Sequence, residues 1–408
     1  MYQPQAGGPS GGKSKKNAVG PATFLVIFVI AISFGMGFMA SQESWFSAKT
    51  TNDANSSLPD DLSYDSVEEV YDELRRSFDG KLSEEELIDG LKKGLAQASG
   101  DNYTVYFNAG ETSQFYSDLN GSFEGIGAEL GKEDDLVIVV APIKGFPAEK
   151  AGLRPQDAII EIDGEDAIGI PVEEAVSKIR GEAGTDVKLT IARKGERLEI
   201  TITRATITIP SVEYEFIGDQ GDIGYLQITR FAEDTNALAR EAAKAFKDKG
   251  VKGVILDMRS NSGGYVDAAI DVSSIWLNDE VVFEQRSGGA SEGSSVARGN
   301  PILSGVKTIV LINEGSASAS EIVAGALKDN GVAELVGKTS FGKGSVQSLS
   351  EFADGSTLKV TIARWYTPSG TNIDEDGIKP DVEVEFTEED FENDTDSQRD
   401  KAIELLSQ

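Results

Sequence analysis

The chain has 408 residues, enough for about two or three domains. It carries 38 Lys and Arg against 69 Asp and Glu, a formal net charge of −31. This balance argues against nucleic acid as a partner, because no surplus of cations is left to neutralise phosphates. The chain has no cysteine, which excludes disulfides, thiol catalysis and cysteine-ligated metal.

The first 42 residues predict a membrane anchor. Residues 1–16 are polar and contain three lysines, whereas residues 17–42 contain no charge. About 20 apolar residues span a bilayer as a helix, and lysines before the run with acids after it place the N-terminus in the cytoplasm. We therefore expect a cytoplasmic tail over 1–16 and a single transmembrane signal-anchor helix over 17–42. The remainder then lies outside a cell that we expect to be bacterial, in the periplasm or the extracellular space.

A cleaved signal peptide is the alternative for this run. The run is longer than the apolar core of a usual signal peptide, and no clear small-residue cleavage site follows it. Residues 43–63, rich in Ser, Thr, Asn and Asp, predict a solvated linker.

The segment 64–118 has the periodicity of two amphipathic helices. The first pattern consists of Val67, Val70, Tyr71, Leu74 and Phe78. A capping-box pattern, Ser83 to Glu86, precedes the second, which consists of Leu87, Ile88, Leu91 and Leu95. These helices either pack on the neighbouring domain or form a homodimerisation arm, and no sequence feature separates the two roles.

Residues 119–205 predict a compact β-rich module. Strands are expected at 136–140, 158–162, 187–191 and 198–202, the last two forming a hairpin around Lys194 and Gly195. Helical periodicity occurs once, over 172–179.

Residues 206–386 change to strands that alternate with helices. We expect strands at 223–228, 253–258 and 308–312, and helices at 235–249, around 266–276 and through 322–327. Successive strand–turn–helix units predict an α/β core. The acidic C-terminal segment, 387–408, is expected to be solvated up to residue 400 and then to form a short helix.

The loop 315–321 has the composition of a nucleophile loop. Ser318 stands just before a predicted helix, where free N–H groups and the helix dipole favour a developing oxyanion. A serine hydroxyl needs a base near neutral pH, and the chain has no histidine. Lys343 has small, apolar and uncharged neighbours that could strip water from its ammonium and favour the neutral form. The sequence thus predicts a serine hydrolase with a lysine base.

These loops also have simpler interpretations. Serine before a helix is commonly only a cap, and Ser316 and Ser320 are the expected caps here. Residues 337–343 nearly spell a phosphate-binding loop, but Gly344 stands where a Ser or Thr should follow the lysine. We therefore expect neither ATP nor any metal or cofactor.

Two motifs in the β-rich module resemble PDZ domains. Gly125-Ile126-Gly127-Ala128 resembles the carboxylate-binding loop, and residues 147–157 resemble the helix–turn signature before the strand that ends in Asp163-Gly164. Gln156 stands where that family often has Gly. The resemblance implies that the loop captures the terminal carboxylate of a peptide that adds to the sheet as a strand.

The chain after the linker resembles the C-terminal processing peptidases, or tail-specific proteases. Four motifs carry the resemblance: residues 257–264, 316–322, 336–347 and 377–381. The resemblance implies a crotonase-like, ClpP-like α/β core attached to a PDZ domain. It also implies that Ser318 is the nucleophile, that Lys343 is the base, and that Gln347 orients the lysine.

Further roles are implied by the same resemblance. The N–H groups of Ala319 and of Gly264 or Gly263 would form the oxyanion hole, and Arg180 falls near where relatives couple the PDZ module to the core. We thus expect a membrane-anchored, extracytoplasmic serine endopeptidase for proteins with exposed apolar C-termini. The alternatives are an inactive PDZ adaptor that binds protein tails and a lysine-assisted amidase acting on cell-wall peptides.

Overall fold

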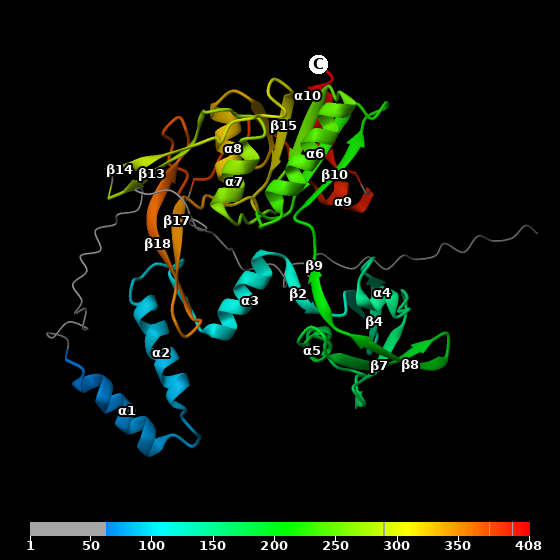
Figure 1. Ribbon diagram of the computed structural model, residues 1–408, viewed down its shortest axis with the longest axis vertical. Helices are drawn as coiled ribbons and strands as arrows, with labels where there is room; N and C mark the ends of the chain where they lie inside the picture. The colour runs from blue at the N-terminus through cyan, green and yellow to red at the C-terminus, as the bar shows by residue number, and fades with distance from the viewer. Residues whose placement is uncertain (1–62, 289, 375, 394) are drawn as a thin grey trace, which may run out of the picture.

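The computed structural model describes residues 63–408, except for residues 289, 375 and 394. The expected cytoplasmic tail, the transmembrane helix and nearly all of the linker lie outside the described residues. Within the described part, no helix is both long enough and apolar enough to cross a bilayer. Figure 1 shows three regions, which are an N-terminal helical region, a small β-rich module and an α/β core.

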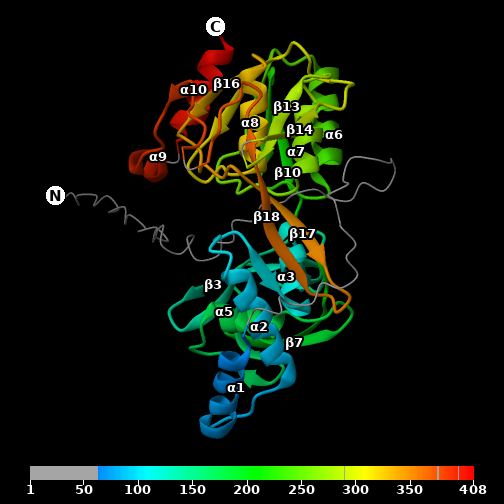
Figure 2. The same cartoon turned by 90° about the vertical axis from the view of Figure 1, so that its left-hand side faces the viewer.

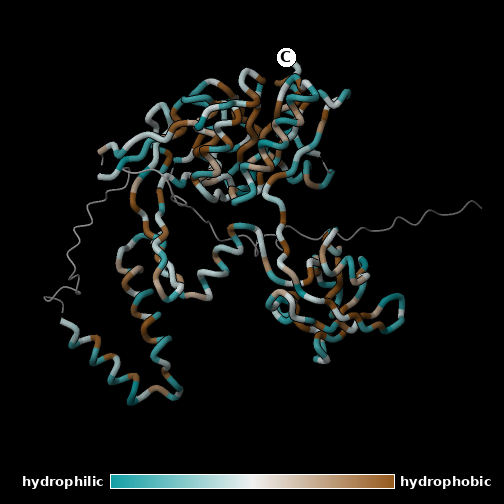
Figure 3. The backbone as a smooth tube through the Cα atoms, viewed as in Figure 1, coloured by the Kyte–Doolittle hydropathy of each residue, from teal (hydrophilic) through white to brown (hydrophobic). Residues whose placement is uncertain are grey.

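The N-terminal region contains more structure than its two predicted helices. Its elements are α1 (Asp65–Ser77), α2 (Glu84–Gln97), β1 (Val105–Phe107) and α3 (Ala109–Leu119). Helix α2 begins at the predicted capping box, where the Glu86 N–H donates to Ser83 Oγ at 3.1 Å. Helix α1 buries none of its residues, and its large apolar side chains are exposed. Figure 3 shows apolar residues along this helix, which lies apart from the core and from the β-rich module.

The β-rich module is built on one five-strand path, in the order β3-β4-β5-β7-β8. Its strands are β3 (Ala128–Glu133), β4 (Leu136–Pro142), β5 (Ala158–Ile162), β6 (Glu165–Asp166), β7 (Asp186–Arg193) and β8 (Glu196–Thr203). Its helices are α4 (Pro147–Lys150) and α5 (Val172–Ile179). The predicted hairpin joins β7 to β8, and both central residues, Lys194 and Gly195, have the positive φ that a tight hairpin turn favours.

Two strands outside that sheet connect the module to the rest of the chain. β2 (Ser122–Gly125) pairs antiparallel with β9 (Ala205–Thr208), so the chain enters and leaves the module side by side (Figure 1). The module has its own core, in which Val137, Ile159 and Leu189 are fully buried.

The α/β core is a six-stranded sheet in the order β10-β11-β12-β15-β16-β19. Its strands are β10 (Val212–Ile217), β11 (Ile223–Ile228), β12 (Gly253–Asp257), β15 (Lys307–Ile312), β16 (Ala333–Gly337) and β19 (Val382–Glu383). All neighbours pair in parallel except β10, which runs antiparallel to β11.

Helices cover both faces of this sheet. α6 (Thr235–Lys249), α7 (Val266–Ser273) and α8 (Ala319–Asp329) pack on one face, and α10 (Ser397–Leu406) packs on the other (Figure 2). Alternation along β12 explains this, because Val254 and Leu256 point toward α6 to α8 while Ile255 points toward α10.

A second, antiparallel sheet was not predicted. It contains β1, β13 (Val281–Ser287), β14 (Ala290–Val296), β17 (Ser345–Glu351) and β18 (Thr357–Tyr366). The hairpin of β17 and β18 extends from the core to the N-terminal region (Figure 2). There Tyr106 of β1 lies opposite Leu358 of β18, so the N-terminal region is joined to the core by backbone pairing.

The C-terminal segment differs from its prediction. Helix α9 (Glu388–Asn393) buries no described residue, as expected of a solvated segment. Helix α10, however, begins before residue 400, and the expectation of solvation up to that point is wrong. The reason is a partly buried ion pair, because Arg259 donates to Asp396 and to Gln398 at 2.8 to 3.0 Å and also binds Asp257 of the core sheet.

Candidate active site

Ser318 lies where strand β15 leads into helix α8, on the residue that precedes the helix. Its φ of 56° is a conformation that L-residues rarely adopt, and such backbone strain is typical of functional turns. The flanking serines hold the loop in place: Ser316 Oγ donates to Met258 O and Ser320 Oγ donates to Asn261 O, both at 2.8 Å. Our expectation that these two serines cap the helix is therefore wrong, since they fasten the loop to the segment after β12.

Glu321 connects the loop of Ser318 with the loop of Lys343. Its Oε2 accepts the backbone N–H of Ser318 at 2.7 Å and that of Lys343 at 3.0 Å. Its Oε1 accepts the Ser340 hydroxyl at 2.6 Å and the Gly342 N–H at 2.7 Å. One carboxylate thus fixes the two backbones that carry the predicted nucleophile and base.

The Glu321 side chain is fully buried in the first turn of α8. Burial raises the pKa of this carboxyl group, and the four hydrogen bonds from the two loops act in the opposite direction. A buried carboxylate with this many donors is held in one position, because any displacement would leave a charge or a donor unsatisfied.

Lys343 is also fully buried. Burial, with a smaller contribution from the charge of Lys359, lowers the pKa of its ammonium to about 7, although Glu321 and Asp101 act to raise it. The Lys343 Nζ lies 4.2 Å from the centre of the Tyr103 ring. The sequence expectation that water is stripped from this lysine agrees with these surroundings.

Gln347 is buried on β17, which begins two residues after Lys343. Its Nε2 donates to Ser345 Oγ at 2.8 Å and to Thr361 Oγ1 at 3.3 Å. Within the described part of the chain, its Oε1 is buried and has no hydrogen-bond partner. This oxygen is the atom that could accept a hydrogen bond from an ammonium group.

The expected oxyanion-hole residues lie around Ser318. Ala319 is the first residue of α8, so its N–H has no acceptor within the helix. A Cβ added to Gly263 would lie 2.9 Å from Ser318 Cβ, which shows how closely that backbone approaches the serine. Because the Gly263 N–H already donates to Asn261 Oδ1 at 2.9 Å, Gly264 is the better candidate of the two glycines.

The expected carboxylate-binding loop joins β2 to β3. Gly125 ends β2, Ile126 is buried, and Ala128 begins β3. Gly127 has a φ of 73°, and a Cβ there would lie 2.7 Å from Phe146 Cβ, so the position needs glycine. Strand β3 is the edge of its sheet and has α5 beside it, which leaves a strand edge for an added peptide.

Arg180 is exposed at the end of α5. Its guanidinium lies 5.0 Å from the centre of the Phe123 ring on β2, the strand that leads into the carboxylate-binding loop. Arg180 is therefore placed on the connection between the module and the rest of the chain.

Sequence reasoning missed two contributors to this site and left a third open. For Glu321 it allowed a role in shaping the site beside a solvated or capping role; the side chain does cap helix α8 by accepting the Ser318 N–H, but it is buried and not solvated. Tyr103 and Lys359 were not identified, because Tyr103 reaches Lys343 through the pairing of β1 with β18 and Lys359 lies on β18, which pairs with the strand that follows Lys343.

The comparisons with known proteins agree with this architecture. Residues 222–384 match peptidase family S41 and residues 138–193 match the PDZ domain. The core and the module together therefore define a serine peptidase of the S41 class that carries a PDZ domain. A crystal structure of an S41 protease from Bacteroides fragilis has the same fold, with a TM-score of 0.52 and 20% identity over 77% of this chain and 90% of that chain.

Sequence relatives narrow the class to one family. The chain is 38% identical to the carboxy-terminal processing protease CtpA of Bacillus subtilis over 329 residues, which cover 80% of this chain and 70% of that protein. It is 41% identical to a CtpA-like serine protease of Staphylococcus haemolyticus over 308 residues, 75% of this chain and 60% of that protein. The chain belongs to the C-terminal processing peptidase family, which confirms the resemblance seen in its motifs.

Proposed function

We propose that the protein is an endopeptidase that cleaves with Ser318 and Lys343. The observation that carries this proposal is the double contact of Glu321, which holds the backbones of both residues. Neutral Lys343 would take the proton of Ser318 Oγ as that oxygen attacks the scissile carbonyl carbon. The N–H groups of Ala319 and Gly264 would stabilise the oxyanion.

The same lysine then completes the reaction. Protonated Lys343 gives its proton to the leaving amine, which breaks the peptide bond and leaves an acyl group on Ser318. Lys343 next takes a proton from water as the water attacks the acyl carbon, and it returns this proton to Ser318 Oγ as the acyl bond breaks, which releases the carboxylic acid and restores the neutral lysine. Because burial brings the pKa of Lys343 to about 7, a large share of the enzyme has the neutral base at neutral pH.

Gln347 would orient the base during these steps. Its partnerless Oε1 suits an acceptor for the ammonium that forms transiently, and its Nε2 is already bound to Ser345 and Thr361. A buried acceptor without a partner favours the charged lysine, so it would help the lysine to receive the proton.

Recognition of the substrate is assigned to the PDZ module. The N–H groups of the loop 125–128 would hold a terminal carboxylate while the peptide adds to the free edge of β3. The name of the Bacillus subtilis relative, a carboxy-terminal processing protease, supports the same use of the module here. Arg180, which contacts β2, would couple occupancy of this loop to the core.

The protein would act outside the cytoplasm, held by its apolar run 17–42. Cell fractionation should find it in the membrane, with residues after the run open to added protease from outside.

The exposed apolar side of α1 would serve as a homodimerisation arm, since exposed apolar surface on a helix favours a covering partner.

Recognition of C-termini can be tested with paired substrates. An unfolded protein that ends in small apolar residues should be cleaved faster than the same protein with an amidated C-terminus. We expect a difference of about 10-fold or more, because a lost charge-assisted hydrogen bond costs roughly 1.5–3 kcal/mol. Equal rates for the two substrates, with Ser318→Ala inactive on both, would show that the enzyme does not read the terminal carboxylate.

A further inference from the structure

A turn of the N-terminal region reaches the buried lysine. The turn joins α2 to β1 and contains Asp101, Asn102, Tyr103 and Thr104. The partly buried Tyr103 ring lies with its centre 4.2 Å from Lys343 Nζ, a distance typical of an ammonium that rests against an aromatic ring. A residue outside the peptidase core thus forms one wall around the base.

Side-chain hydrogen bonds hold this turn on strand β18. Asp101 Oδ2 accepts the hydroxyl groups of Thr104 at 2.6 Å and of Thr361 at 2.5 Å, and Asp101 Oδ1 accepts the Tyr103 N–H at 3.3 Å. The Thr361 N–H donates to Thr104 Oγ1 at 3.2 Å. Thr361 also accepts the Gln347 amide. One connected set of hydrogen bonds therefore links the turn that carries Tyr103 to Gln347, the expected orienting residue.

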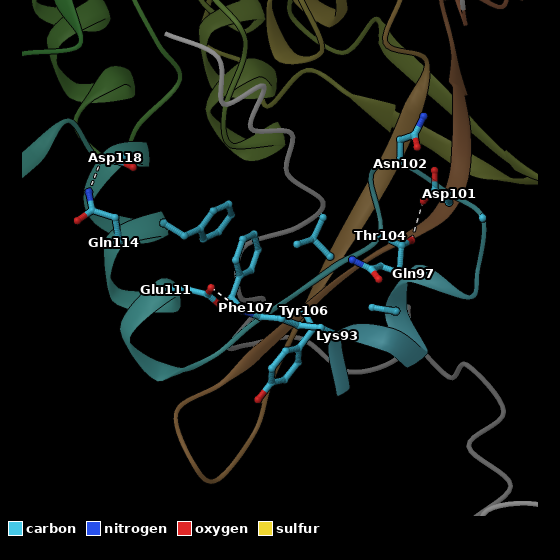
Figure 4. A pocket seen from close by; sticks show the side chains of 14 residues that line it. Lys93, Gln97, Asp101, Asn102, Thr104, Tyr106, Phe107, Glu111, Gln114 and Asp118 are labelled. Atoms are coloured by element: carbon cyan, nitrogen blue, oxygen red, sulfur yellow. Dashed lines mark hydrogen bonds and ion pairs between the residues drawn. The ribbon is translucent and has the colours of Figure 1, made fainter. Parts of the chain in front are cut away.

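Figure 4 shows the same turn from the side of the N-terminal region. Asp101, Asn102 and Thr104 line a cavity of about 650 Å³ that also contacts α2, β1 and α3. The bond between Asp101 and Thr104 is visible there. Because open space lies next to the turn, its position depends on the bonds to β18 as well as on packing.

We propose that Tyr103 is a positioning residue for the peptidase reaction, whose ring covers the Lys343 ammonium, excludes water from it and fixes the place of its nitrogen. The proposal rests on the proposed function, since it concerns the lysine base. It adds the N-terminal region to the parts of the chain that the reaction needs.

The ring acts on the base in two opposing ways. Attraction between the ring face and the ammonium raises the pKa of Lys343 by about 1.5 units. Exclusion of water acts in the opposite direction, and burial, to which the ring contributes one wall, is the main cause of the lowering of this pKa to about 7. We expect loss of this wall to outweigh loss of the attraction, so removal of the ring should raise the pKa of Lys343.

Other charges around Lys343 would remain after removal of the ring. Lys359 on β18 lowers the pKa of Lys343, whereas Glu321 on α8 and Asp101 in the turn raise it. Lys359 is itself buried and lies 5.6 and 5.8 Å from the ring centres of Phe107 and Phe115. Near Tyr103, the pair of Arg364 and Asp374 is joined at 2.8 Å and stays intact.

The test is the pH dependence of kcat/KM, measured with the full chain and an unfolded protein substrate. In the unaltered enzyme the acid limb should be half-complete near pH 7. Tyr103→Ala should move this limb to higher pH by about one unit, because water reaches the lysine, and should also lower kcat. Tyr103→Phe is the matched control, since it keeps the ring and should leave the profile unchanged.

An acid limb that stays in place in Tyr103→Ala would overturn the proposal, because a purely structural role lowers the rate equally at every pH. If Tyr103→Ala does not fold, Thr104→Val decides the question. It removes the hydroxyl that bonds Asp101 and the Thr361 N–H while keeping the side-chain shape, it leaves the hydrogen bonds of Gln347 in place, and it should move the limb in the same direction by less.

The outcome also separates this proposal from the proposed function. Persistent activity in Ser318→Ala would contradict the dyad itself. An inactive Ser318→Ala enzyme together with an unmoved limb in Tyr103→Ala would contradict only the role of Tyr103.

Discussion

The active site and helix α1 distribute charge and apolar surface in opposite ways. At the site, the charged side chains of Lys343 and Glu321 are 0% exposed. On α1, Val70 is 61% exposed and no residue is buried. Both regions invert the usual rule that apolar groups are inside and charges outside.

The two inversions have different physical justifications. The buried carboxylate is stabilised by four hydrogen-bond donors, and the buried lysine can lose its charge because its pKa is about 7. The apolar side of α1 has no such compensation within the described chain. A buried charge with its own partners indicates chemistry at that place, whereas uncovered apolar surface indicates a partner that covers it.

The largest expected effect on activity comes from removal of either reacting group. Ser318→Ala and Lys343→Ala should each lower kcat by roughly 10⁴- to 10⁶-fold, because no histidine can replace the base. Peptidase assays on the purified variants check this, with circular dichroism to show that the fold is intact. Retained cleavage in either variant would mean that the buried lysine has a structural role instead.

A smaller loss of activity should follow from changing Glu321, which joins the loops of Ser318 and Lys343. Glu321→Gln replaces one acceptor by an NH₂ group that faces N–H donors, so the loops must separate. We expect about 10²-fold lower kcat, as small misplacements of reacting groups produce, and about 1–3 kcal/mol lower free energy of unfolding.

The matched control is Glu314→Gln, an exposed residue of the connection between β15 and α8. It should leave both the rate and the denaturant midpoint unchanged. Equal effects of the two substitutions would remove the distinction between the buried and the exposed carboxylate.

The smallest effect on catalysis is expected from α1. Leu74→Asp places a charge on its exposed apolar side and should raise the dissociation constant of the proposed homodimer by about tenfold or more, since burying one leucine contributes roughly 1.5–3 kcal/mol. Sedimentation equilibrium measures this, and Glu69→Lys on the opposite side of the helix is the control. An unaltered protein that is monomeric at all concentrations would show that α1 covers something else.

Elements with a strong local pattern could be predicted from the sequence. The expected helix over 235–249 and the strand over 223–228 are confirmed with those bounds. The second sheet was missed because β1 has only three residues and β14 is mostly Ser, Gly and Ala, without apolar alternation. Its strands are set by pairing with distant segments.

The candidate site also contains residues that local motifs predict and residues that only distant contacts bring together. Motifs located Ser318 and Lys343, and the chemistry of a chain without histidine made the lysine the expected base. The burial of Glu321 depends on where the loop of Lys343 folds over α8, which no local pattern specifies. The contact of Tyr103 with Lys343 requires that β1 pairs with β18, two segments that are far apart in the chain.

The ion pair of Arg259 with Asp257 and Asp396 determines how far the cooperative folding unit of the core extends. The family match ends at residue 384, before α10 begins. A chain shortened to that residue would keep Arg259 and Asp257 but lose Asp396, and it would uncover the apolar side chains beneath α10. Its core sheet should therefore exchange amide hydrogens faster, since global opening would now cost less free energy.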